Sequence, residues 1–547
     1  MANPFDDAPA WKERVAQKGR DVPMKHSGWT RRLFLRRTGL LGAGMVAFPI
    51  LTRASAVRAA APKRGGTLRY GMNLAPAALD PHRWTSAAQD VILGMVYSRL
   101  LQLAPNWNSF EPDLAEKWSV SPDGKLYTFT LRPNVRFHDG SMLRAEDIVF
   151  SFGRIMDPKT NALLRPMLAD VFDRAEAAGP RTVRIVLKRR FSPLLAVLAL
   201  PTAAMVSKDW VTKGGNLAVA LMGTGPMRFI SMESNVKITL TRHAQYYEPG
   251  VPYLDGMSCI FITDETARST ALRNGSVDFV DYLPYKDRDI LQADPNIRIY
   301  SDSVASGVWA MANVKRPPLD NPMVRQAINW AINRDAVLKA AFFGRGAIMD
   351  TVFMPKTLWA YSADTPKYGY DPDRAKSLLA KSGVRMPVDL EILSAPFAAY
   401  GPPSQVLQAN LQDVGFNVKL ELPDFAQQLR RFFASDYQIG IWGGGPPFAD
   451  PDFLSVFFDS KGGVGRTTGY VNRPLEGFLQ EARTTLGERR RKALYVQAYK
   501  IIVDDGPWFP MVYRAQAEAS ASYVQGYNRV LGNAWNGIRI AKTWITK

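Results

Sequence analysis

Residues 113–140 read DLAEKWSVSPDGKLYTFTLRPNVRFHDG, and this stretch carries the plainest fold signal of the chain. Its Pro122-Asp123-Gly124 segment is typical of a tight turn. After the turn, the large side chains of Tyr127, Phe129 and Leu131 alternate with polar ones, which predicts a half-buried strand over 125–131. The pattern of residues 146–155 favours a helix soon afterwards.

The flanking sequence continues this mixture of strands and helices. Asn321 can cap a helix whose first turn contains Pro322, and a second helix begins after Asp371. Alternating strands and helices then predict an α/β lobe. The predicted strands are 67–72, 182–187, 236–240, 257–262, 388–393, 417–422 and 437–442, and further helices are predicted at 91–101, 404–414 and within 475–503.

Length and charge narrow the class of protein. A chain of 547 residues is too long for one ordinary core, so two or more lobes are expected. The net charge is +19, but residues 1–59 hold eleven Lys/Arg and four Asp/Glu and so supply +7 of it. The remaining charge is spread without a basic block, which is typical of solvated surface charge. The sequence therefore predicts no nucleic-acid partner.

The first 59 residues are typical of a secretory leader. Residues 30–36, TRRLFLR, precede an apolar run over 40–51, and small residues follow at 54–56 and 59–61. The arginine pair Arg31-Arg32 resembles the twin-arginine export motif. The apolar run is too short for a bilayer of roughly 30 Å, although an uncleaved N-terminal anchor is the alternative. We expect cleavage after Ala56 or Ala59 and a soluble mature protein.

The single cysteine bears on the compartment. Cys259 can form no internal disulfide, and no cysteine follows the leader to accept a lipid anchor. These features favour a soluble protein of a bacterial periplasm over a lipoprotein.

A series of short motifs gives the family resemblance. In order they are GGTLRYG (65–71), ALDPH (78–82), the 113–140 stretch, AEDIVFSF (145–152), GTGPM (223–227), ALRNGSVDF (271–279), PPLDNPMVRQAINWAINRDAV (317–337), YGYDPDRAKSLLAKSG (368–383) and IWGGGPPFADPDF (441–453). Together these motifs closely resemble the family 5 extracellular solute-binding proteins, the peptide/nickel class of ABC importers. The resemblance covers nearly the whole chain after the leader.

The resemblance implies an α/β, two-lobed periplasmic-binding-protein fold of type II character, with an extra subdomain inserted in the first lobe. Its predicted divisions are a twin-arginine signal peptide at 1–59, the first lobe at 60–105 and 200–300, the inserted subdomain at 106–199, the second lobe at 301–510 and a return to the first lobe at 511–547. The solute is expected between the lobes, where hinge closure would create the surface that the permease recognises.

Nothing in the sequence favours catalysis, a cofactor or a metal. Only His82, His138 and His243 follow the leader, and no nucleophile elbow, HExxH motif or paired cysteines occur. The His138-Asp139 pair is better explained by a turn than by a metal site, and the Gly-rich 223–226 segment lacks a phosphate-binding Lys-Ser/Thr. The expected protein is not an enzyme.

The resemblance also suggests the ligand contacts. In peptide-binding members, a tryptophan at the position of Trp442 lies at the cleft, and an Asp three residues later binds the peptide's α-amino group. Here that position is Gly445, which argues against a free-amine peptide because a buried ammonium would lack a partner. Asp450 is the alternative anchor, if the loop brings it near. The predicted ligand-binding residues are Arg83, Trp84, Thr85, Ser86, Trp309, Trp442, Gly443, Gly444, Gly445, Asp450, Tyr513 and Arg514.

Arg514 is predicted as an anion clamp, and Tyr246 as a further aromatic contact. For Trp84, Trp309, Tyr246, Tyr513 and Arg514, packing without ligand contact is the competing interpretation.

These observations predict a monomeric periplasmic receptor that delivers a solute to an inner-membrane ABC permease. The solute classes left open are a peptide, a modified peptide or opine-like conjugate, and an oligosaccharide. The alternatives are a receptor that serves a signalling or chaperoning partner, a nickel-complex-binding protein, and a periplasmic enzyme exported by the twin-arginine route.

Overall fold

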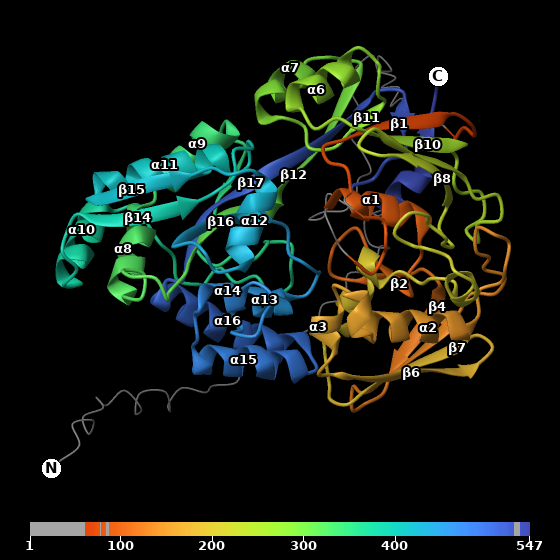
Figure 1. Cartoon of the computed structure of the whole chain (residues 1–547), viewed down its shortest axis with the longest axis horizontal. Coiled ribbons are helices and arrows are strands. Elements are labelled where there is room, and N and C mark those ends of the chain that lie inside the picture. Colours follow the sequence, from red (N-terminus) through yellow and green to blue (C-terminus); the bar gives the residue numbers. More distant parts are fainter. Residues whose placement is uncertain (1–60, 77, 84–86, 530–536) are drawn as a thin grey trace, which may run out of the picture. The chain divides into compact units, whose positions relative to one another are not determined.

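The computed structural model describes residues 61–547, with the exception of 77, 84–86 and 530–536 (Figure 1). The predicted leader lies outside the described residues. Ala61–Lys547 forms one compact unit.

One mixed sheet runs through this unit. Thr67–Met72 (β1) pairs in parallel with both neighbours, as Val388–Leu393 (β14) does, whereas the long strands in between pair antiparallel. The sheet order is β15 (Phe416–Glu421), β14, β16 (Ile439–Gly444), β12 (Ile297–Ala312), β17 (Trp508–Ala521), β11 (Phe279–Val280), β1, β10 (Gly256–Phe261), β9 (Lys237–Arg242) and β8 (Met227–Glu233), with β13 (Gly346–Ile348) paired to β17.

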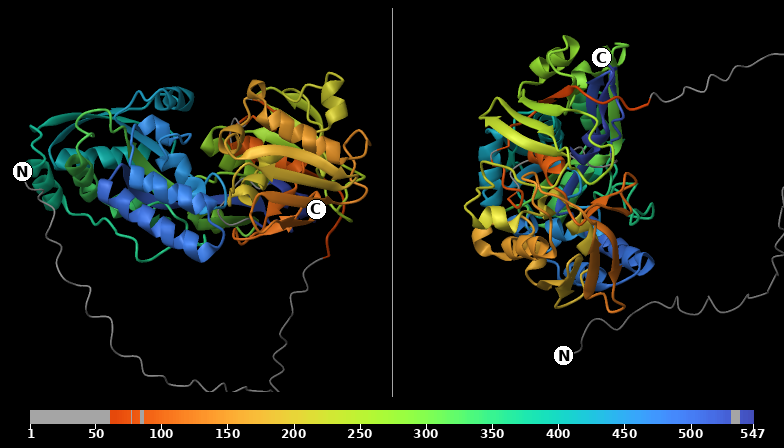
Figure 2. Two further views of the ribbon diagram at one scale, coloured as in Figure 1. Left: turned by 90° about the horizontal axis from the view of Figure 1, so that it is seen from below. Right: turned by 90° about the vertical axis from the view of Figure 1, so that its right-hand side faces the viewer.

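A second sheet belongs to the first half of the chain. Its strand order is β4-β5-β7-β6, and Ala145–Met156 (α2) packs against β6 and β7 (Figure 2). The buried faces of α2 and β5 form because Ile148, Phe152 and Phe129 point into one apolar cluster. The strands are β4 (Ala115–Val120), β5 (Leu126–Leu131), β6 (Phe172–Gly179) and β7 (Thr182–Leu187), and a small hairpin, β2 (Leu101–Leu103) and β3 (Phe110–Pro112), precedes them.

We call the part built on β1 and β8–β11, together with the four-stranded sheet, the first lobe. Its other helices are α1 (Ala87–Val96), α3 (Arg165–Leu168), α4 (Leu194–Leu198), α5 (Lys208–Thr212), α6 (Glu265–Arg273) and α7 (Arg288–Gln292). The chain ends beside β1, where the short strands β18 (Val524–Gln525) and β19 (Trp544–Ile545) pair.

We call the part built on β14–β16 the second lobe. Two of its helices begin as the sequence predicts: the side chain of Asn321 accepts a hydrogen bond from Met323 N, and the side chain of Asp371 accepts one from Arg374 N. The helices are α8 (Pro322–Ala331), α9 (Arg334–Phe342), α10 (Pro372–Lys381), α11 (Gly401–Asp413), α12 (Phe425–Phe433), α13 (Leu454–Phe458), α14 (Gly465–Thr468), α15 (Arg473–Thr484) and α16 (Glu488–Asp505).

Two strands connect the lobes. β12 and β17 run antiparallel and pair with first-lobe strands at one end and second-lobe strands at the other. Their own pairing is interrupted between Asp302 and Ser306, opposite Gln516 and Arg514. We call this interruption the crossing point, because the chain passes there from one lobe to the other.

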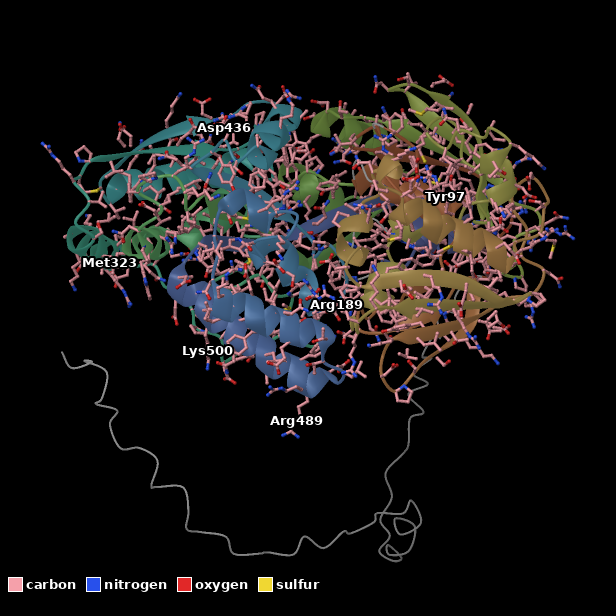
Figure 3. All side chains as sticks on the ribbon, turned by 60° about the horizontal axis from the view of Figure 1, so that its bottom comes forward. Tyr97, Arg189, Met323, Asp436, Arg489 and Lys500 are labelled. Carbon is pink, nitrogen blue, oxygen red and sulfur yellow. The ribbon has the colours of Figure 1, made fainter. Side chains whose placement is uncertain are left out.

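The lobes also meet away from the crossing point. Ser192 donates hydrogen bonds from its amide to Arg483 O (2.9 Å) and from its hydroxyl to Thr485 O (2.6 Å). Arg190 donates to Thr484 O (3.3 Å), and neighbouring Arg189 is labelled where the four-stranded sheet approaches α15 and α16 (Figure 3). These bonds join a first-lobe segment to the end of α15, and we call them the lobe seam.

Most predicted elements are present, and the predicted α/β two-lobed class is confirmed. The strands predicted at 67–72, 182–187 and 388–393 match β1, β7 and β14 residue for residue. The helix predicted at 91–101 was placed wrongly: α1 ends at Val96, and Leu101 begins β2. The predicted lobe boundaries stay predictions.

Candidate functional site

The crossing point carries an unusual strand. From Arg514 onward β17 reads RAQAEASA, so alanines fill one face while Arg514, Gln516, Glu518 and Ser520 share the other. All four polar side chains are at most 3% exposed. A buried polar row of this kind requires hydrogen-bond partners, since each unmet donor or acceptor costs free energy.

Arg514 finds few partners among the described residues. Its Nη1 donates to Gln516 Oε1 (2.6 Å), its Nη2 approaches Tyr282 Oη (3.4 Å), and its Nε has no partner there. The guanidinium also lies over the ring of Tyr282, 5.5 Å from its centroid. Although burial opposes the charged form, Tyr282, Tyr285 and Tyr400 surround the group and hold the pKa of Arg514 above its usual value.

Trp442 lies at the end of β16, next to three glycines. Its ring stacks on Phe432 with centroids 4.7 Å apart, and it remains partly exposed. Gly443 must be glycine, because a Cβ there would lie 2.8 Å from Gly307 O and 2.9 Å from a ring carbon of Tyr400. Gly444 has φ +139°, and the partly buried Gly445 follows it.

Tyr400 connects these glycines to Arg514. Its hydroxyl donates to Gly443 O (2.9 Å). Burial raises the pKa of Tyr400, and nearby Arg514 opposes that rise. Sequence reasoning missed Tyr400, Tyr282, Tyr285 and Gln516, and only the alternating pattern around Gln516 could have marked one of them.

Two of the predicted aromatic contacts are buried in the second-lobe core. Trp309 pairs with Trp442 across β12 and β16, is fully buried, and packs edge-on against Trp508 with centroids 4.8 Å apart. Tyr513 Oη donates to Met354 O (3.0 Å) and accepts from Met354 N (3.1 Å). Both side chains therefore pack against the second lobe, in keeping with the competing interpretation.

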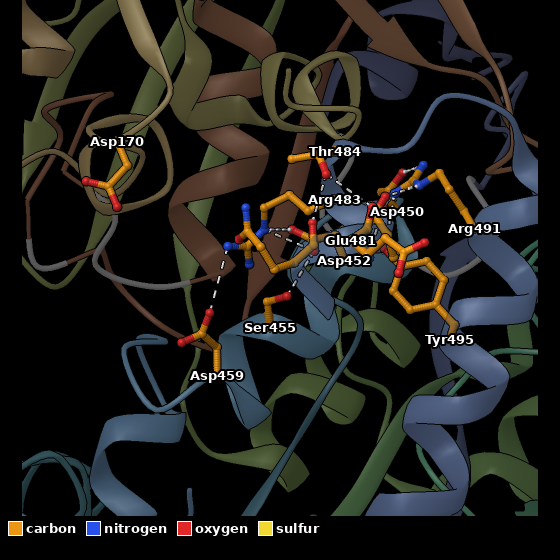
Figure 4. A network of polar contacts seen from close by, with 12 residues as sticks. Asp170, Asp450, Asp452, Ser455, Asp459, Glu481, Arg483, Thr484, Arg491 and Tyr495 are labelled. Carbon is orange, nitrogen blue, oxygen red and sulfur yellow. Dashed lines mark hydrogen bonds and ion pairs between the residues drawn. The ribbon is translucent and has the colours of Figure 1, made fainter. Parts of the chain in front are cut away.

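The carboxylate of Asp450 is hydrogen-bonded to an arginine. Arg491 donates to both of its oxygens, at 2.8 and 2.6 Å, and both side chains are less than a tenth exposed (Figure 4). Arg491 also bonds to Tyr495 Oη (3.1 Å) and Ala482 O (3.0 Å). Bidentate pairing of this kind is the strong form of an Arg–carboxylate contact. Asp450 thus ties its loop to α16, and Arg491 already compensates its charge.

A neighbouring pair continues the network toward the lobe seam. Arg483 contacts Asp452 (3.1 Å) and Asp459 (3.8 Å), while Ser455 donates to Asp452 (2.9 Å) (Figure 4). Burial raises the pKa of Asp452 to about 6 despite the opposing effect of Arg483. Since Arg483 O accepts from Ser192 N, this network supports the seam directly.

The loop predicted to contact ligand in the first lobe starts from a buried anchor. Arg154 contacts both oxygens of Asp80 and also His82 Nδ1 (2.8 Å), while His82 Nε2 donates to Ala204 O (2.9 Å). Burial and Arg154 lower the pKa of His82 to about 4. Arg83 follows and is exposed. Trp84, Thr85 and Ser86 lie outside the described residues.

The other histidines hold the Gly-rich turn. His138 Nε2 and His243 Nδ1 both donate to Gly225 O, at 3.0 and 3.1 Å. Gly223 and Gly225 approach the backbone at Val96 so closely that a Cβ would collide with it. In the described part of the chain, no group of three His, Cys, Asp or Glu side chains could hold a metal ion. None of the helices described there has the length and hydropathy that a bilayer crossing needs.

A family model described as "Bacterial extracellular solute-binding proteins, family 5 Middle" matches residues 109–466. The chain belongs to this family. Among its relatives, the dipeptide-binding protein of Escherichia coli strain K12 is 28% identical over 91% of this chain and 97% of its own length.

Two family 5 structures with bound ligand are also similar. The periplasmic binding protein AgaA of A. tumefaciens R10, solved with agropinic acid, is 28% identical with a TM-score of 0.81 and covers 88% of this chain and 99% of its own. The ABC-transporter-associated binding protein DppA of Helicobacter pylori, solved with the peptide STSA, is 27% identical with a TM-score of 0.81, covering 89% and 99%.

The predicted function class is thereby confirmed. Family 5 consists of solute-binding proteins, and this chain is the substrate-binding component of an ABC importer. Its similarity to these proteins extends along nearly their whole length, so both lobes and the crossing strands belong to the shared fold.

Proposed function

We propose that the chain is a monomeric, non-catalytic receptor of the periplasm that encloses one solute between its lobes and presents it to an inner-membrane permease. The observation that carries this proposal is the pair of lobes joined by β12 and β17 and also held together at the lobe seam. Lobes that touch at a distance from their hinge are typical of the closed state of a receptor.

A second contact between the lobes supports the closed state. Asn108, beside the β2–β3 hairpin, donates to Thr357 O (2.6 Å) and accepts from Trp359 N (3.1 Å). Buried apolar residues of the four-stranded sheet and of α16 also form one continuous cluster. A solute would be enclosed on the crossing-point side of these contacts.

The proposed contact residues are those around the crossing point, together with the first-lobe segment that the family resemblance marks at residues 83–86. Trp442 offers a partly exposed ring and the three glycines offer backbone close to it, while Arg514 offers a charge. We keep Trp309, Tyr513 and Asp450 as supports for these groups. The proposed contacts are Arg83, Trp84, Thr85, Ser86, Trp442, Gly443, Gly444, Gly445 and Arg514.

The solute is proposed to be an opine-like conjugate or modified peptide in preference to a peptide with a free amine. Gly445 supplies no carboxylate, and both oxygens of Asp450 contact Arg491. The similarity to AgaA, whose structure contains agropinic acid, favours the same class. The relative named for dipeptide binding keeps peptides as the second candidate.

A thermal-denaturation screen tests this proposal. The purified protein is heated with agropinic acid, di- to pentapeptides, oligosaccharides and nickel–histidine complexes. A ligand at about a hundred times its dissociation constant adds roughly 2.7 kcal/mol to the free energy of unfolding. Stabilisation by a conjugate alone supports the proposal, and stabilisation by free-amine peptides contradicts the solute class. A visible absorption band or stoichiometric metal in the purified protein would favour the enzyme alternative.

Export is tested separately. We propose the twin-arginine route, on the residues TRRLFLR at 30–36. Replacement of Arg31 and Arg32 by lysine is expected to retain the precursor in the cytoplasm, as seen by cell fractionation. Unchanged periplasmic protein would indicate the general secretory route.

A further inference from the structure

The arginines near the crossing point are unequally paired. Arg345 contacts Asp289, and Arg529 lies 4.0 Å from Glu518. Arg514 and Arg288, both less than a tenth exposed, have no carboxylate within ion-pair distance among the described residues. A buried cation without an anion is costly, so two uncompensated charges at one place call for explanation.

Arg288 contacts the backbone of β17 beside Arg514. Its Nη1 donates to Ala515 O (3.2 Å), one residue from Arg514, and its Nε has no described partner. Tyr285 interacts electrostatically with both arginines. Burial raises the pKa values of Tyr285 and Tyr400, so these phenols stay protonated at neutral pH and supply no negative charge.

Two other buried arginines of the described residues donate mainly to backbone carbonyls. Arg334 donates to five carbonyl oxygens, including Pro510 O (2.8 Å) and Met349 O (3.1 Å). Arg325 donates to three. These side chains brace loops and need no counter-ion nearby. Arg514 differs, because its acceptors among the described residues are side chains: the amide oxygen of Gln516 at 2.6 Å and the hydroxyl of Tyr282 at 3.4 Å.

Two hydrogen-bond donors at Arg514 and Gln516 lack a described acceptor. Because Gln516 accepts from Arg514 through Oε1, its amide NH2 is left without a described partner, as is Arg514 Nε. Both residues lie on the same face of β17. The cluster therefore offers an excess of donors and positive charge, which suits an anionic acceptor with two oxygens.

The backbone of Tyr282 supports this assignment. Its φ is +41°, a left-handed conformation that is unfavourable for a residue with a bulky side chain. That conformation accompanies a ring placed beneath the guanidinium of Arg514. Strained residues that persist in a fold cluster at ligand sites.

We propose that Arg514 and the amide NH2 of Gln516 bind a carboxylate of the transported solute at the crossing point. This inference rests on the proposed receptor function and specifies its substrate class as acidic. The carboxylate could come from the C-terminus of a peptide or from the acid end of an opine-like conjugate. Arg288 contributes positive potential from the start of α7.

Binding measurements test the proposal. Agropinic acid and a panel of dipeptides and N-acylated dipeptides are titrated by calorimetry, each peptide beside its C-terminal amide. The wild type is expected to bind an acid and reject the matching amide. Arg514→Gln is expected to weaken acid binding about thirtyfold or more. Arg298→Gln, which removes an exposed arginine from β12, is the matched control and should bind as the wild type does.

The panel also distinguishes the two sources of the carboxylate. Preference for N-acylated dipeptides or agropinic acid identifies a conjugate, and equal binding of plain dipeptides identifies peptide C-termini. Amides that bind as well as acids, or full acid binding by Arg514→Gln, overturn the proposal while leaving the receptor function intact. If no solute binds the wild type, the proposed function fails.

Melting temperatures of the empty protein test the role of Arg514 even if no solute binds. In the empty protein, Arg514→Met removes an uncompensated charge and is expected to leave the melting temperature unchanged or raised. Arg334→Met, which leaves carbonyls without donors, is expected to lower it. A loss for Arg514→Met as large as that for Arg334→Met means that Arg514 is structural, and overturns the proposal.

Discussion

Replacement of Asp450 separates a structural carboxylate from a ligand anchor. In Asp450→Asn the isosteric amide can accept from only one nitrogen of Arg491, so a guanidinium is left buried beside a neutral group. Breaking a buried pair on one side costs about 3–5 kcal/mol. Unfolding of about 490 residues has an entropy of roughly 1 kcal/mol per degree, so the melting temperature should fall by about 3–5 °C.

The assay measures stability and affinity on the same samples. Melting curves are recorded for the wild type, Asp450→Asn, Arg491→Met and the double variant, without ligand and with the solute found in the screen. If Asp450 is structural, both single variants lose stability and the double variant recovers part of it, because no unpaired charge remains. Solute affinity is expected to change less than about threefold in each.

The opposite pattern would refute this reasoning. An anchor for the solute's amine would, on removal, weaken binding by several kcal/mol and leave the empty protein nearly as stable as before. Additive losses in the double variant would mean that Asp450 and Arg491 are not coupled, contrary to their bidentate contact.

Three further predictions concern the glycine loop, a buried acid and the lobe seam. Gly445→Asp is expected to increase the affinity for free-amine peptides. Gly463→Asp adds the same charge at an exposed position and is the control. Equal peptide binding by both variants would contradict the placement of the site. Burial raises the pKa of Asp281 to about 7, so the folded protein loses stability as the pH rises from about 4 to about 7 and this carboxyl ionises. Asp281→Asn should therefore be as stable as the wild type near pH 4. At pH 8 its free energy of unfolding, measured with urea, should exceed that of the wild type by on the order of 3–4 kcal/mol. Ser192→Ala removes one hydrogen bond across the lobe seam and should weaken solute binding about fivefold. The radius of gyration of the variant in solution should be larger than that of the wild type. An unchanged affinity would mean that the lobe seam does not stabilise the closed state.

The elements that the sequence predicted best have strong local signals. β5 follows a Pro-Asp-Gly turn with large side chains at alternate positions, and α8 has both a capping Asn and an N1 proline. Such signals act within a few residues and do not depend on tertiary contacts with the rest of the chain.

The strand that carries Arg514 was missed, although the strand that ends near Trp442 was predicted. β17 alternates polar residues with alanine, and alanine, glutamine, glutamate and serine are not typical strand formers. The segment is nevertheless a strand, because β12, β11 and β13 pair with it from both lobes. That pairing involves partners as far away as Phe279, which pairs with Ser520, and no local pattern reveals it. The role of Asp450 was left open for a similar reason, since Arg491 lies 41 residues further along the chain.

The position of Arg514 links solute binding to closure. β12 and β17 are interrupted opposite Arg514, so rotation of one lobe against the other would concentrate there, while the paired halves move as rigid parts. Arg514 and Arg288 are both less than a tenth exposed in this structure, and closure at the lobe seam would remove water from both guanidinium groups. Without an anion this desolvation opposes closure; with a carboxylate on Arg514, the same burial strengthens the ion pair. An acidic solute would therefore favour the closed form more than a neutral solute with equal apolar contact, and the permease would encounter the closed receptor mainly when it is loaded.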